Sequence, residues 1–130
     1  MSTIKRFEDL EIWQEARALA KEILKIIFLT NLKNDYKLRD QIKGSSGSAM
    51  DNIAEGFDRD GNMEFRQFLS IAKGSAGETR SQLYRVFDSG YITEIELNDL
   101  VTRYINLSKR ISAFINYLNK KEYKGIKYKG

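Results

Sequence analysis

Hydrophobic residues recur every three or four positions along four stretches of the chain, and polar or charged residues occupy the positions between them. This spacing is typical of amphipathic helices, and no stretch alternates with the two-residue period of a strand. We therefore predict four helices, over residues 8–28, 35–57, 62–89 and 93–118.

Local signals mark several of the predicted helix ends. Asn62 follows a turn-forming segment and is suited to cap the third helix. Gly90 can end that helix in a left-handed conformation, and Thr93 followed by Glu96 matches a capping box. Because the connections are short, consecutive helices should be antiparallel neighbours. The sequence thus predicts an all-α, antiparallel up-down-up-down four-helix bundle.

The first helix carries an apolar arc that is wider than one packing face requires. Two stripes lie side by side on it: Leu10, Trp13, Ala20, Leu24 and Ile27 form one, and Ile12, Ala16, Leu19, Ile23 and Ile26 form the other. We expect the second stripe to join copies of the chain in a closed assembly.

Two glycine-rich stretches, residues 43–56 and 72–77, fall inside the second and third predicted helices. Antiparallel packing across the turn near residue 61 places one stretch opposite the other. We predict that the two helices touch closely at the glycines of these stretches, or leave a groove there for a third partner. The helix-packing residues are Gly44, Gly47, Gly74 and Gly77. The alternative is that one stretch is a loop.

Composition removes several classes of chemistry. The chain has no cysteine and no histidine, so disulfides, thiol catalysis, thiolate metal sites and Glu-x-x-His di-iron sites are excluded. The acidic residues show no clustered spacing that asks for an all-carboxylate metal site. We expect no enzyme activity, no metal and no cofactor. No apolar run approaches a membrane span and no signal peptide is visible, so we expect a cytoplasmic protein without a membrane partner.

The charge is unevenly distributed. Residues 1–119, which we assign to the bundle, carry 17 Lys/Arg and 17 Asp/Glu, whereas residues 120–130 form a basic C-terminal tail. Its lysines are interleaved with Tyr123 and Tyr128, an arrangement that suits single-stranded nucleic acid; the alternative is a disordered, solubilising end. The five tail lysines are Lys120, Lys121, Lys124, Lys127 and Lys129.

Two further groups of polar residues are candidates for function. Arg66, Lys73 and Arg80 recur every seven residues on the third helix, so they could follow a phosphate backbone, contact a neighbouring subunit or face water. Asn52 and Glu55 border the apolar face of the second helix. We interpret them as a polar network between the second and third helices, with Glu55 facing Arg66; the alternative is a ligand or RNA site.

Several segments also resemble the four-helix-bundle proteins of the 23S rRNA intervening-sequence family. They are LRDQI (38–42), NIAEG (52–56), FLSIAKGSAGE (68–78), GYI (90–92) and FEDLEIWQEA (7–16). The resemblance implies a homopentamer of four-helix bundles. It also implies a relation to the accessory protein of diversity-generating retroelements, which binds a reverse transcriptase and nucleic acid. Where the family usually has an arginine-alanine pair after QI, this chain has Lys43 and Gly44, and lysine is a weaker substitute for an arginine contact.

Taken together, these features favour a non-catalytic, homo-oligomeric binding module. We expect RNA, a ribonucleoprotein or a reverse-transcriptase-like protein as its partner. The alternative is a structural oligomer or a protein-protein adaptor that binds no nucleic acid.

Overall fold

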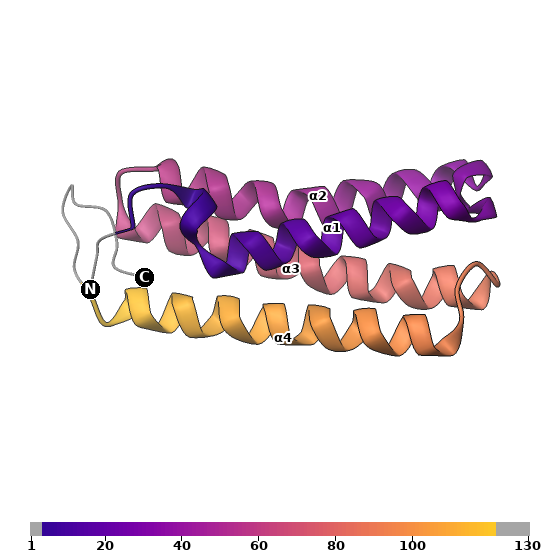
Figure 1. Cartoon of the computed structure of the whole chain (residues 1–130). Helices are drawn as coiled ribbons and strands as arrows, with labels where there is room; N and C mark the ends of the chain where they lie inside the picture. Colours follow the sequence, from indigo (N-terminus) through magenta and orange to yellow (C-terminus); the bar gives the residue numbers. More distant parts are fainter. Residues whose placement is uncertain (1–3, 122–130) are drawn as a thin grey trace.

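The computed structural model describes residues 4–121, and over that range the chain forms four α-helices and two short 3₁₀ turns, without a strand (Figure 1). The elements are η1 (Phe7–Asp9), α1 (Glu11–Leu29), η2 (Asn31–Asn34), α2 (Tyr36–Asp58), α3 (Asn62–Asp88) and α4 (Glu94–Asn119). The four predicted helices are confirmed. Both glycine-rich stretches are helical, so the loop alternative is wrong.

Hydrogen bonds between helices show how they run relative to one another. Ser45 of α2 meets Thr79 of α3, and Ser48, further along α2, meets Ser75, which comes earlier in α3. Residue numbers therefore rise along α2 as they fall along α3, as expected for antiparallel neighbours. In Figure 1 the ribbon reverses direction between each helix and the next in the same manner.

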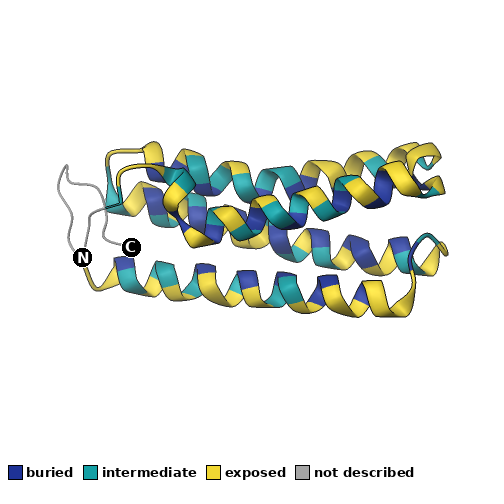
Figure 2. Cartoon of the chain, in the orientation of Figure 1, coloured by how far each residue is buried: buried dark blue, intermediate teal, exposed yellow. Residues whose placement is uncertain are grey.

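The core is built from one face of each helix (Figure 2). In α1 the buried face is the stripe that we expected to join copies of the chain. Ile12, Leu19 and Ile26 are 4%, 0% and 8% exposed, so they are fully used inside the bundle. The prediction that these three residues form an oligomer interface is wrong, because α1 needs this whole stripe to pack against α2 and α4.

The turn between α3 and α4 forms as its sequence predicts. Gly90 adopts a φ of 83°, and the amides of Gly90 and Tyr91 donate to the carbonyls of Phe87 and Val86. These are the two hydrogen bonds of a Schellman motif. Thr93 and Glu96 exchange side-chain and backbone hydrogen bonds at 2.9 and 3.1 Å, so the predicted capping box is present.

Asn62 does not cap α3 as predicted. The N-cap position is Gly61, which has no side chain to offer. Instead, the Asn62 amide donates to the carbonyls of Leu118 and Lys121 at 2.9 and 3.0 Å. Carbonyls at a helix C-terminus lack intrahelical donors, so this side chain satisfies the end of α4 and attaches it to the start of α3.

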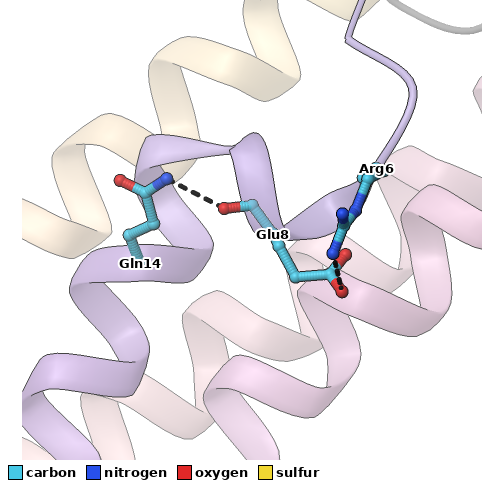
Figure 3. Close-up of polar contacts among 3 residues, drawn as sticks. All are labelled: Arg6, Glu8 and Gln14. Atoms are coloured by element: carbon cyan, nitrogen blue, oxygen red, sulfur yellow. Dashed lines mark hydrogen bonds and ion pairs between the residues drawn. The ribbon is translucent and has the colours of Figure 1, made fainter.

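The chain enters α1 through the turn η1, where three polar residues fix its path (Figure 3). The side chain of Gln14 donates to the backbone carbonyl of Glu8 at 2.8 Å, and Arg6 forms an ion pair with the Glu8 carboxylate at 2.9 Å. The hydrogen bond from Arg6 lowers the pKa of Glu8 and raises the pKa of Arg6.

Candidate nucleic-acid interface

The four glycines predicted to pack α2 against α3 do not do so. Gly44 and Gly74 are exposed, Gly47 and Gly77 are half-buried, and a Cβ atom built at any of them would meet no neighbour within 4 Å. The glycines therefore lie away from the seam, with open space around them.

Small residues do line the contact between α2 and α3, but they are serine, alanine and threonine. Ala49 and Ala72 are buried, and Ser48 meets Ser75 at 2.9 Å. The close approach is found further along α2, at Gly56. A Cβ at that position would lie 2.6 Å from the Cβ of Phe68.

A buried polar cluster crosses the same seam. Ser45 donates to the Gln82 side-chain oxygen at 2.6 Å, and Thr79 donates to Ser45 at 2.8 Å. Thr79 is fully buried, and Tyr104 of α4 is 1% exposed beside this cluster. Burial raises the pKa of the Tyr104 phenol, an effect that the Thr79 hydroxyl opposes. The hydrogen bonds among Ser45, Thr79 and Gln82 favour one register of the helices over its neighbours.

Asn52 belongs to this polar seam, whereas Glu55 does not. The Asn52 amide donates to the side chain of Ser48 at 3.0 Å, and Ser48 in turn contacts Ser75 across the interface. Glu55 instead pairs at 2.9 Å with Arg59, the residue that directly follows α2, and both side chains are about half exposed. The prediction that Glu55 faces Arg66 is therefore wrong.

Two of the three basic residues in the stripe that repeats every seven positions, Arg66 and Lys73, lie on the side of α3 that faces α4. The guanidinium of Arg66 donates to the side-chain oxygen of Asn119, the last residue of α4. Lys73 is exposed and borders a shallow groove between the two helices, and Arg80 is half-buried. The other lining residues of this groove are Ser70, Gly74, Ser112, Ile115 and Asn116.

The bond from Arg66 to Asn119 brings the stripe to the beginning of the basic tail. Lys120 and Lys121 follow Asn119 directly, and both are exposed. The Lys121 ammonium lies 5.7 Å from the ring centre of Tyr117, within cation–π range. The remaining tail lysines, Lys124, Lys127 and Lys129, lie outside the described residues.

The helical segments that meet along this groove share one property: neither contains an acidic residue. Residues 65–77 of α3 include Arg66 and Lys73, and residues 100–119 of α4 include Arg103, Lys109 and Arg110, with no Asp or Glu in either range. The two arginines of α4 reach α1, where Arg103 and Arg110 pair with Glu15 and Glu11. The positive charge on the exposed side of α3 and α4 is therefore not neutralised by carboxylates from these two segments.

We call this surface the α3/α4 basic face and define it by Arg66, Lys73, Lys109, Lys120 and Lys121. Lys109 lies outside the repeat of Arg66, Lys73 and Arg80, so that spacing did not indicate it. The gap in acidic residues would have revealed it in the sequence, because α4 carries no carboxylate after Asp99. Only the fold shows that the two segments without acidic residues are neighbours.

Other charged surfaces are less uniform. The outward groove on α2 combines Lys43 with Asp40 and Asp51. On α1, Arg17, Lys21 and Lys25 are exposed, and Lys25 is 3.6 Å from Glu22. Within residues 4–121, no three acidic side chains are gathered as metal ligands, and no helix has the length and apolar character needed to cross a bilayer.

Fold and surface together define a helical-bundle protein with one face that is basic and free of acidic residues. The chain belongs to the family of 23S rRNA-intervening sequence proteins, whose model matches residues 8–113. This finding confirms the resemblance that we drew from the sequence.

A solved structure supports the fold independently. The chain is similar to a protein of unknown function from the S23 ribosomal protein family of Bacteroides thetaiotaomicron, with a TM-score of 0.74 and 24% identity. The similarity covers 81% of this chain and 95% of that protein. None of the curated proteins compared matches this chain.

Proposed function

We propose that this protein is a non-catalytic, homo-oligomeric module that binds RNA, free or within a ribonucleoprotein, through the α3/α4 basic face. The observation that supports the proposal is the contact between Arg66 and Asn119, which makes one continuous basic surface from the α3 stripe and the first tail lysines. The family to which the chain belongs is consistent with a partner that contains RNA.

The charge distribution explains why this face should attract a polyanion. The bundle is neutral by count over residues 1–119, so long-range attraction must come from a local excess of positive charge. The acid-free segments of α3 and α4 provide that excess on the bundle, and residues 120–130 add to it in sequence. Phosphate contacts of this kind carry no sequence information, so we expect RNA binding with weak sequence preference.

The homo-oligomeric part of the proposal rests on the family resemblance, which implies five copies. In a ring of five, each basic face would be repeated, and several weak contacts to one RNA strand would add up to a higher apparent affinity. Light scattering after size-exclusion chromatography measures the number of copies directly. A mass of about five times 15.1 kDa is expected.

RNA binding is tested by reversing charges on the face. We expect Lys73→Glu with Lys109→Glu to weaken binding to an unstructured single-stranded RNA. Each lost phosphate contact should lower the slope of log K against log salt by about 0.7. Deleting residues 120–130 should have a similar effect. The matched control is Arg17→Glu with Lys21→Glu, which makes the same change of net charge on the outer side of α1.

Three outcomes distinguish the alternatives. If both pairs of reversals weaken binding equally, net charge and not the α3/α4 basic face is responsible. If only the truncation weakens binding, the tail alone is the site. If the unmodified protein binds no RNA at low salt, the function is that of a structural oligomer or a protein-protein adaptor.

A further inference from the structure

One end of the bundle exposes more apolar surface than the rest. At the end where α1 stops and α2 and α4 begin, four large side chains face solvent: Phe28, Leu29, Tyr36 and Ile95, which are 71%, 80%, 64% and 83% exposed. In Figure 2 this is the end on the right, where the turns are largely exposed. A single exposed apolar residue is ordinary, but four at one end of a small domain are typical of an interaction surface.

The two helix connections at this end differ in the sign of their net charge. Lys33 and Lys37 lie at the connection from α1 to α2, and Asp88 and Glu94 lie at the connection from α3 to α4. All four side chains are exposed, and within residues 4–121 none of them takes part in an ion pair. Each half also holds a side chain of the other sign: Asp35, which accepts a hydrogen bond from Tyr91, lies between the two lysines, and Arg85 lies one turn before Asp88. By net charge, the end of the bundle has a basic half and an acidic half around its apolar residues.

We propose that this end binds the same end of a second copy of the chain, in an end-to-end contact with twofold symmetry. A twofold contact uses the same patch on both copies, so the patch must be complementary to itself. The twofold axis lies in the plane of the contact, along the boundary between the two halves. Rotation about this axis places the basic half of each copy on the acidic half of the other. The apolar residues are then covered at the centre of the contact.

Other partners fit this surface less well. RNA or an anionic lipid surface would be attracted by Lys33 and Lys37 but repelled by Asp88 and Glu94 at the same end of the molecule. Only a partner with both signs, in the opposite arrangement, satisfies all four charges. A second copy of the chain has that arrangement by symmetry.

Charge reversal gives a test that other partners cannot mimic. Lys33→Glu with Lys37→Glu makes both halves acidic, and Asp88→Lys with Glu94→Lys makes both halves basic. Each variant alone should have half the mass of the unmodified protein in sedimentation experiments, because like charges then meet across the contact. An equal mixture of the two variants should regain the full mass. The expected halving is the same whether the associating unit is one chain or a ring.

The controls separate this contact from folding and from RNA binding. Glu96 is left unchanged because it is part of the capping box of α4. Leu29→Ser with Ile95→Ser removes the apolar centre and should halve the mass of that variant. Met63→Ser, an exposed apolar residue at the other end, should leave the mass unchanged.

The contact is independent of the α3/α4 basic face, so it stands or falls separately from the proposed function. The proposal is overturned if the unmodified protein and the reversed variants have equal mass across a wide range of concentration. It is also overturned if the mixture of reversed variants fails to regain the larger mass.

Discussion

Gly56 of α2 lies so close to Phe68 of α3 that a Cβ atom at position 56 would be 2.6 Å from the Phe68 Cβ. The same atom would be 3.1 Å from the ring of Phe65, which is fully buried. The Cβ of Phe68 cannot move without its backbone, so the two helices would have to separate. The close approach that we expected at Gly44, Gly47, Gly74 and Gly77 is thus found at Gly56.

Gly56→Ala should therefore destabilise the protein. Overpacking of a core typically lowers the free energy of unfolding by about 1–3 kcal/mol, and the better helix propensity of alanine returns at most about 1 kcal/mol. Urea denaturation followed by circular dichroism measures the difference. A stability equal to or above that of the unmodified protein would contradict the close packing.

Gly44→Ala provides the matched control and is a prediction in its own right. The position is exposed, helical and has open space around a Cβ atom, so alanine should raise the free energy of unfolding by up to about 1 kcal/mol. Because both alanines gain helix propensity, the difference between the two variants measures the packing effect at Gly56. A loss of stability in Gly44→Ala would mean that this side of α2 is covered by another molecule.

Local rules explain why the helices and their ends could be predicted from the sequence. The turn at Gly90 and the capping box at Thr93 depend on a few adjacent residues and form as expected. The rotation of α2 against α3 could not be predicted in this way. Residues 44–49 read GSSGSA, so every side of this part of the helix is small and the pattern has no preferred face. The hydrogen bonds of the serines decide which side turns inward.

The candidate site shows the same division between local and long-range information. Arg66, Lys73 and the tail lysines can be selected from the sequence by their spacing and charge. These residues form one face because Arg66 donates a hydrogen bond to Asn119, and the two residues are more than fifty positions apart in the sequence. Neither residue carries a local signal of that contact.

The buried polar cluster should make Ser45→Ala destabilising. Alanine leaves the side-chain oxygen of Gln82 without the hydrogen bond it receives at 2.6 Å, and an unsatisfied buried acceptor costs about 1–3 kcal/mol. Tyr104→Phe is the contrasting variant, because the Tyr104 hydroxyl is buried without a hydrogen-bond partner of good geometry. Its removal should leave stability unchanged or raise it. Equal losses in both variants would show that volume and not hydrogen bonding governs this region.

The contact between Tyr91 and Asp35 should make stability depend on alkaline pH. The phenol of Tyr91, after the α3 turn, donates to the Asp35 carboxylate before α2 at 2.9 Å, so it ties the two connections at one end of the bundle together. This hydrogen bond raises the pKa of Tyr91, because loss of the phenolic proton would place two negative charges side by side. The stabilisation is therefore complete below the pKa of an unfolded tyrosine, about 10, and is lost as the pH rises through the higher pKa of the folded protein. We expect the unmodified protein to be more stable than Tyr91→Phe at neutral pH, and the difference to shrink above about pH 10.

Urea denaturation of both proteins at neutral and alkaline pH checks this, with Tyr84→Phe, an exposed tyrosine of α3, as the control. A difference between the unmodified protein and Tyr91→Phe that stays constant into strongly alkaline solution would show that the Tyr91 phenol does not act through Asp35.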